Sequence, residues 1–171
     1  MKRRTAAAPL LLALVAGALV APAGSSASSA SSTSSATSVS RACTPGITKV
    51  DGKKAQSFCG PAKAVAMIGK KRFAFSGGVC QKSGVVFTVN IGTIVISAVA
   101  NAKPGSTPYF GLTVTPADSG VHVGQTLSWI SGGKRYGVVS DRIKLKAGLK
   151  SGSFSGTALP GGGKVTGTFS C

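Results

Sequence analysis

Apolar and polar residues alternate along two adjacent segments, and a period of two is typical of half-buried β-strands. The inward positions are Phe73, Phe75 and Val79 on the first segment, and Val85, Phe87, Val89 and Ile91 on the second. Residues 81–84 (QKSG) separate the two runs with turn-forming side chains. The pattern therefore predicts a β-hairpin over residues 72–92, with Cys80 at the end of its first arm.

Two glycine-containing dipeptides predict further hairpins. Asp51-Gly52 is a preferred type I′ turn, and it lies between the predicted strands 47–50 and 53–58. Gly132-Gly133 connects residues 126–130 with 134–139 and places Trp129 opposite Tyr136. Such a cross-strand aromatic pair stabilises a hairpin by up to ~1 kcal/mol relative to alanines. The pair can also serve as an aromatic platform for a ligand such as a sugar.

A last hairpin is expected from the nearly mirror-image sequences of residues 153–157 and 166–170. Pairing Phe154 with Phe169 leaves residues 160–163 as a four-residue loop. This register turns Cys171 towards the inner face, together with Val165 and Phe169.

Additional strands are predicted at residues 61–68, 109–115 and 142–146, whereas residues 93–100 fit either a strand or a short helix. Short strands separated by turn signals favour a sandwich over a helical fold. The expected fold class is therefore a mostly β, antiparallel, sandwich-like domain with several hairpins and little helix.

The amino-terminal segment has the three parts of a secretory signal peptide. Lys2-Arg3-Arg4 precedes an apolar stretch at residues 6–20 and the small residues of Ala21-Pro22-Ala23, so cleavage after Ala23 is expected. The apolar stretch is short for a membrane span. Residues 24–42, rich in Ser, Thr and Ala, predict a disordered linker, and residues 43–171 a disulfide-bonded domain. We expect a secreted, extracellular protein that can associate with the cell envelope and has no stable membrane anchor after cleavage.

Four cysteines in an exported chain indicate two disulfides, for which three connectivities exist. The turn at Asp51-Gly52 brings Cys43 close to Cys59, which leaves Cys80 to pair with Cys171. A metal site is not expected, because the chain has no Cys-x-x-Cys pair and His122 is its sole histidine.

The chain is strongly basic, with 20 Lys and Arg against 3 Asp and Glu and a formal net charge of +17. This balance favours polyanionic partners, such as an anionic wall polymer or glycan, and it equally explains solubility. Two clusters are candidates for polyanion binding, with protection of sheet edges by lysine as the alternative. They consist of Lys70, Lys71 and Arg72, and of Arg142, Lys144 and Lys146. No nucleic-acid-binding motif accompanies the charge, so no specific nucleic-acid partner is expected.

Catalysis is not expected, because few side chains can transfer protons. The three carboxylates are Asp51, Asp118 and Asp141, and the segment most similar to a Gly-x-Ser-x-Gly motif, residues 152–156, has phenylalanine at the nucleophile position. We therefore predict no catalytic residues and no cofactor.

Several motifs together resemble a known family. They are Val65 to Lys70 (VAMIGK), Gly77 to Cys80 (GGVC), Gly84, Asn90 to Gly92 (NIG) and Thr166 to Cys171 (TGTFSC). This pattern resembles the mycobacterial nineteen-kilodalton lipoprotein antigen family, of actinobacterial type, over about residues 63–171. The resemblance implies a surface-exposed antigen and adhesin without known catalysis, in which Cys80 and Cys171 correspond to the family's cysteine pair. The lipid-bearing cysteine is missing here, and Cys43 and Cys59 are additional.

The sequence thus predicts a non-enzymatic surface interaction protein. The alternative is a cationic binding module for an anionic wall polymer or glycan, and a small secreted enzyme is the third interpretation.

Overall fold

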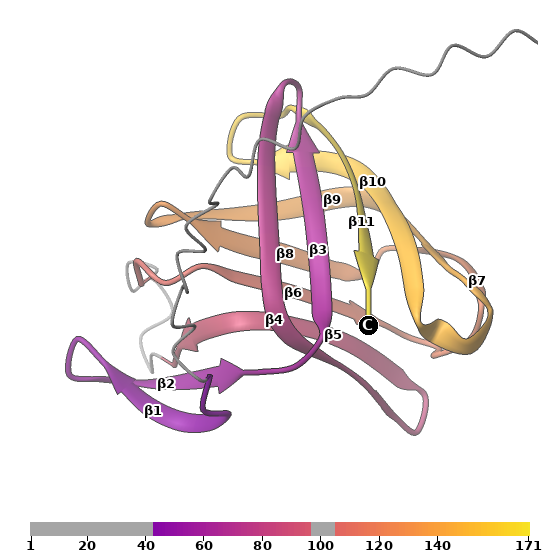
Figure 1. Cartoon of the computed structure of the whole chain (residues 1–171). Coiled ribbons are helices and arrows are strands. Elements are labelled where there is room, and N and C mark those ends of the chain that lie inside the picture. Colours follow the sequence, from indigo (N-terminus) through magenta and orange to yellow (C-terminus); the bar gives the residue numbers. More distant parts are fainter. Residues whose placement is uncertain (1–42, 97–104) are drawn as a thin grey trace, which may run out of the picture. The chain divides into compact units, whose positions relative to one another are not determined.

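Antiparallel β-strands dominate the computed structural model, which describes residues 43–96 and 105–171 (Figure 1). These residues belong to one compact unit, Ser40–Cys171. The strands are β1 (Gly46–Val50), β2 (Lys53–Phe58), β3 (Ala62–Ile68), β4 (Lys71–Ser83), β5 (Val86–Val95), β6 (Tyr109–Val114), β7 (Gly120–Val123), β8 (Thr126–Ser131), β9 (Lys134–Leu145), β10 (Ser151–Leu159) and β11 (Lys164–Ser170). A 3-10 turn, η1 (Ala147–Leu149), connects β9 to β10.

The predicted signal peptide and linker, residues 1–42, lie outside the described residues. Of the ambiguous segment 93–100, residues 93–95 continue β5 as a strand and residues 97–100 lie outside the described part. No helix in residues 43–96 and 105–171 has the length and hydropathy needed to span a bilayer.

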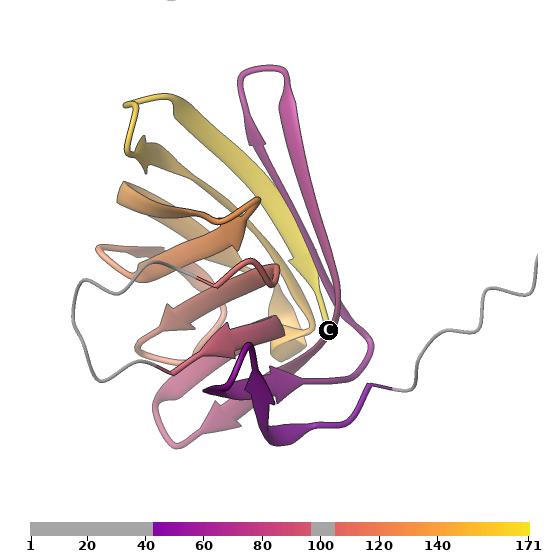
Figure 2. The ribbon, with the colours of Figure 1, turned by 90° about the vertical axis from the view of Figure 1, so that its left-hand side faces the viewer.

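The strands form a closed barrel. Eight of them follow one another in the order β5-β4-β3-β11-β10-β9-β8-β6, and β6 pairs back with β5. The β1–β2 hairpin pairs with the end of β5, and β7 pairs with β9 beside the ring (Figures 1 and 2). The mostly β, antiparallel prediction is confirmed, but the sandwich is wrong. Alternation and turn signals are shared by both architectures, and the ring is closed by the pairing between β3 and β11, its first and last strands in the sequence, which lies outside any predicted hairpin.

Large side chains fill the interior of the barrel. The pairs that face inward between β5 and β6 are Phe87 with Val114, Val89 with Leu112 and Ile91 with Phe110, and each of these side chains is at most 2% exposed. Aromatic rings link them to the opposite wall, with Phe110 5.8 Å from Phe154 and Phe87 6.1 Å from Phe169 between ring centroids. An eight-stranded barrel is just wide enough to be filled in this way.

The predicted hairpins at Asp51-Gly52 and Gly132-Gly133 are confirmed in position and register. Val50 pairs with Lys53, and Trp129 pairs with Tyr136. The predicted strands at 134–139 and 142–146 are one strand, β9, so residues 140–141 are not the expected connection between strands but a bulge at which the β9–β10 register shifts. Neither residue is a glycine or a proline that would interrupt the strand.

The central hairpin, β4–β5, is confirmed with two corrections. Ala62 pairs with Gly78 whereas Lys63 pairs with Ser76, so Gly77 is an extra residue, a β-bulge with φ +79°. The bulge reverses the alternation, and Val79 therefore does not share the inward face of Phe73 and Phe75, as predicted. The turn is also shorter than expected: β4 continues to Ser83, leaving residues 84–85 as a two-residue turn. Val85 is therefore a turn residue that is 65% exposed, and its predicted inward position is wrong.

The register of the last hairpin differs from the prediction by two residues. Phe154 pairs with Gly167, and Phe169 pairs with Gly152, so each ring lies over a glycine of the neighbouring strand. A Cβ atom at Gly152 would lie 2.6 Å from the Phe169 ring, and one at Gly167 would collide with the Phe154 ring. The mirror-image sequence permits both registers, and the observed one gives each ring the space above a glycine.

Candidate polyanion-binding surface

Two disulfides cross-link the domain that carries the candidate surface. Cys43 pairs with Cys59 across 5.7 Å between Cα atoms, and Cys80 pairs with Cys171 across 5.5 Å, as expected from the sequence. The expected inward position of Cys171 is wrong, because this residue follows the end of β11 and is exposed. Structural disulfides form in oxidising environments and indicate a non-cytoplasmic compartment.

The first basic cluster is divided by strand alternation. Lys70 lies in the β3–β4 turn, and Lys71 and Arg72 open β4 with their side chains on opposite faces. The Lys71 Nζ atom lies 5.0 Å from the centroid of the Phe73 ring, a cation–π geometry. Arg72 pairs with Met67 and belongs to the outer face of the barrel. Of these three cations, Arg72 is therefore the one that the outer face of β4 presents.

The second basic cluster forms the expected ridge. Arg142 and Lys144 are exposed on β9 and alternate with Ile143 and Leu145, which are 0% and 2% exposed. Lys146 is also exposed and directly follows the strand.

Protection of a sheet edge can explain the first basic cluster, at the start of β4, but not the second, on β9. The Arg142–Leu145 part of β9 pairs with β10 on one side and with β7 on the other, so it is not an edge. Before Gly78, β4 pairs with β3 alone among the described strands, and lysine or arginine there can guard a free edge.

The two clusters lie on one continuous face but not side by side. Strand pairing connects Arg142 to Ser155, Thr166, Met67 and Arg72 in a single row. Four steps between strands, each of about 4.8 Å, separate the two arginines by about 19 Å along the curved sheet. Figure 1 shows β4, β3, β11 and β10 following one another across this face.

Hydroxyl groups occupy the centre of the face, and the sequence prediction missed them. The outward pairs between β10 and β11 are Ser151 with Ser170, Ser153 with Thr168 and Ser155 with Thr166. The outward side chains of β9, β10, β11 and β3 are called the β10–β11 face below. A period-two repeat of Ser and Thr at residues 151–155 and 166–170 is the signal for these rows, and the predicted register did not place its members opposite one another.

None of the three carboxylates lies on the β10–β11 face. Asp51 is in the β1–β2 turn, and the Asp118 carboxylate lies 3.3 Å from His122 Nε2 in the loop before β7. Asp141 is 3% exposed and accepts a hydrogen bond of 3.0 Å from the Gln125 backbone amide. The positive charge of the face is therefore not neutralised by Asp or Glu side chains.

Catalytic constellations are not found in the described part of the chain. His122 is 8% exposed, and besides the carboxylate its Nε2 atom contacts the backbone oxygen of Asp118, four residues earlier, at 3.1 Å. Among the serine side chains that the structure describes, none is hydrogen-bonded to this ring. The same residues contain no group of three or more His, Cys, Asp or Glu side chains placed to hold a metal ion.

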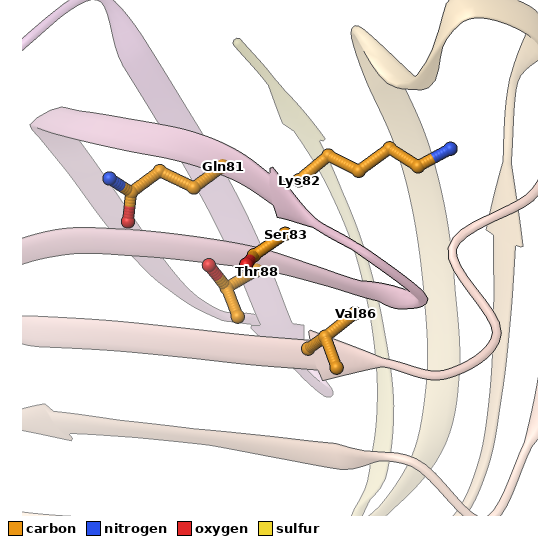
Figure 3. Close-up of a pocket in the computed structure, with 5 residues that line it drawn as sticks. All are labelled: Gln81, Lys82, Ser83, Val86 and Thr88. Carbon is orange, nitrogen blue, oxygen red and sulfur yellow. The ribbon is translucent and has the colours of Figure 1, made fainter.

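A depression of about 450 Å³ lies beside the β4–β5 turn (Figure 3). Its lining residues are Gln81, Lys82, Ser83, Val86 and Thr88. Lys82 extends away from the other four side chains, as Figure 3 shows. The lining contains no carboxylate or imidazole, and so lacks the groups for acid–base catalysis at neutral pH.

Two aromatic residues serve the core rather than a surface site. Trp129 stacks on Tyr136 at 5.3 Å between ring centroids and is 0% exposed, so it cannot form a platform for a sugar. The Tyr109 hydroxyl donates a hydrogen bond of 2.7 Å to Asn90 Oδ1. Burial raises the pKa of the Tyr109 phenol above its ordinary value.

Comparison of the chain with protein-family models, curated proteins and solved structures finds no match. The resemblance to the nineteen-kilodalton lipoprotein antigen family therefore stays a prediction.

Proposed function

We propose that this chain is an exported, non-enzymatic interaction protein that binds an anionic polymer at the cell envelope. The observation that carries the proposal is the β10–β11 face, where exposed cations flank rows of hydroxyl groups and Asp and Glu side chains are lacking. Arg142 and Lys144 contribute most to the proposal, because edge protection does not account for them.

The distribution of charge supports the same function. Every Lys and Arg side chain that the structure describes is exposed, and one carboxylate, Asp141, is buried. Exposed cations of this kind release counterions from a polyanion, so affinity falls steeply as the salt concentration rises. Export through the predicted signal peptide would bring the domain to anionic wall polymers or glycans.

A protein partner is the second candidate function. Val121 and Val123 on β7 are 51% and 63% exposed and pair with Lys144 and Arg142. Apolar side chains beside cations suit the surface contact of an antigen-like adhesin, the role that the family resemblance implies.

Salt-gradient elution from purified cell wall and from heparin tests the proposal. The charge variant Arg142→Gln/Lys144→Gln removes two cations from the face, and the control variant Lys53→Gln/Lys54→Gln removes two exposed cations from β2. We expect the first variant to elute at a clearly lower salt concentration than the second. Equal elution of the two variants would show that net charge alone determines retention, and would contradict the proposal.

A further inference from the structure

We infer that the β10–β11 face binds an extended anionic polysaccharide, a polymer that carries sugar hydroxyls together with carboxylate, sulfate or phosphate groups. The inference rests on the proposed function and names the ligand class of the same surface. It follows from the combination of hydroxyl rows with cations on both flanks.

The hydroxyl rows provide a regular set of hydrogen-bonding groups. Ser153, Thr166, Thr168 and Ser170 are exposed, and Ser151 and Ser155 are half-buried. Alternate residues of a strand are about 7 Å apart and neighbouring strands about 4.8 Å apart, so the rows form a grid. Among the described residues, no protein group is hydrogen-bonded to these side chains. Each hydroxyl can therefore donate a hydrogen bond to a sugar hydroxyl or accept one from it.

Cations lie on both sides of this grid. On the β9 side, Arg142 pairs with Ser155 and Lys144 pairs with Ser153. On the β3 side, Lys63 pairs with Ser170. A polymer along the grid would place anionic groups within reach of these side chains, and arginine can bind a carboxylate or phosphate with two parallel hydrogen bonds.

The face is also hollowed around Lys63. A depression of about 140 Å³ lies between β3 and β11 and is lined in part by Lys63, Thr168 and Ser170. A second depression, of about 360 Å³, lies between β3 and β4 and is lined in part by Lys63 and Arg72. The lining residues thus combine hydroxyl and cationic groups at one place on the sheet.

The composition of the face disfavours other polymers. Stacking on exposed aromatic rings provides much of the affinity for single-stranded nucleic acids. The aromatic residues of β10 and β11, Phe154 and Phe169, face the interior and are 3% exposed. Without aromatic rings, the face relies on charge and hydroxyl groups, and an anionic polysaccharide matches both.

Binding of the full chain to polygalacturonate and to inorganic polyphosphate, at equal salt, tests the inference. Polyphosphate carries charge without hydroxyl groups. Replacing two exposed hydroxyls in Thr166→Val/Thr168→Val preserves side-chain shape, and Thr48→Val/Thr126→Val, which replaces one half-buried and one exposed threonine, is the control on β1 and β8. We expect the first variant to bind polygalacturonate about tenfold more weakly, because each lost hydrogen bond lowers affinity severalfold. Its affinity for polyphosphate should fall less, because phosphate oxygens only accept hydrogen bonds whereas sugar hydroxyls also donate them, and the control should bind both polymers normally.

The outcomes separate the inference from the proposed function. The inference is wrong if Thr166→Val/Thr168→Val binds polygalacturonate as tightly as the unmodified chain does. It is also wrong if this variant loses affinity for both polymers to the same extent. Tighter binding of polydeoxythymidine or of anionic lipid vesicles than of polygalacturonate would also overturn it. In each of these cases the proposed function survives if Arg142→Gln/Lys144→Gln still weakens binding, and fails if it does not. Unfolding curves of all variants verify that folding is intact.

Discussion

Phe154 lies directly opposite Gly167 across β10 and β11, and its ring occupies the space that a side chain at position 167 would need. The reciprocal pair, Phe169 over Gly152, repeats the arrangement in the same hairpin. Both rings are buried in the barrel interior, so these glycines set how closely the two strands and their rings can pack. The outward hydroxyl pairs depend on the same register.

Gly167→Ala is therefore expected to destabilise the protein by about 2–3 kcal/mol, as overpacking of a close-packed interior usually does. Gly137→Ala is the matched control, because a Cβ atom at this strand glycine would meet no atom within 4 Å. It should be neutral or slightly stabilising, since alanine restricts the unfolded chain more than glycine does. Urea unfolding at equilibrium measures both changes, and equal stability of the two variants would refute the packing role of Gly167.

Removing the two disulfides should have unequal effects. The sequence separation is 91 residues for Cys80–Cys171 and 16 for Cys43–Cys59. In the chain-entropy account, Cys80→Ser/Cys171→Ser lowers the free energy of unfolding by about 4–5 kcal/mol and Cys43→Ser/Cys59→Ser by about 3 kcal/mol. Chemical unfolding of the two variants measures the difference. A peptide map without reduction that contained a Cys43–Cys80 link would contradict the topology.

Because the Tyr109 phenol is buried, we expect the free energy of unfolding to fall at high pH. Its pKa is raised by burial, so the folded state holds this proton more tightly than the unfolded chain does. The resulting stabilisation is fully present below about pH 10, the ordinary pKa of tyrosine, and is lost as the pH rises from there through the folded-state pKa. Tyr109→Phe should remove this contribution.

Absorbance titration of tyrosinate measures the pKa directly, and pH-dependent unfolding of the unmodified chain and of Tyr109→Phe measures its effect on stability. The comparison between the two proteins cancels the titration of lysines, which both share. A Tyr109 phenol that ionises at its ordinary pKa, together with parallel stability curves, would be inconsistent with a buried hydroxyl bonded to Asn90.

The local sequence was sufficient to predict the register of two strands wherever a turn dipeptide connects them. Asp51-Gly52 determines the register of β1 and β2, because both turn residues adopt positive φ angles, 51° and 74°, that glycine and aspartate tolerate. The Gly132-Gly133 turn does the same for Trp129 and Tyr136. These pairings involve neighbouring segments, and no distant contact competes with them.

Non-local and degenerate pairings could not be predicted in this way. Closure of the barrel depends on the pairing between its first and last strands, β3 and β11, in which Ile68 pairs with Val165, and no turn signal specifies a pairing over this distance in the sequence. The mirror-image sequences of β10 and β11 permit two registers, and packing of Phe154 over Gly167 distinguishes them. The bulge at Gly77 likewise changes which residues face inward without changing the apolar pattern.

The candidate surface was predicted only in part for the same reason. Arg142 and Lys144 were predicted from the sequence, and so was Arg72 on the adjoining strand β4, whereas Lys63 on the β3 side of the face was not predicted. That Lys71 turns to the Phe73 ring follows from strand alternation once β4 is placed. The hydroxyl rows, in contrast, require the observed register, because they arise from residues on two strands.

Mapping of the bound surface by nuclear magnetic resonance tests the central claim most directly. Titration of the isotopically labelled chain with galacturonate oligomers should shift backbone amide signals of β9, β10, β11 and β3, centred on Ser153 and Thr168, in a saturable manner. Signals from the β1–β2 hairpin, which carries Lys49, Lys53 and Lys54, should remain unchanged. Shifts that centre on the β1–β2 hairpin, or that spread over all exposed cations without saturation, would contradict a binding site on the β10–β11 face.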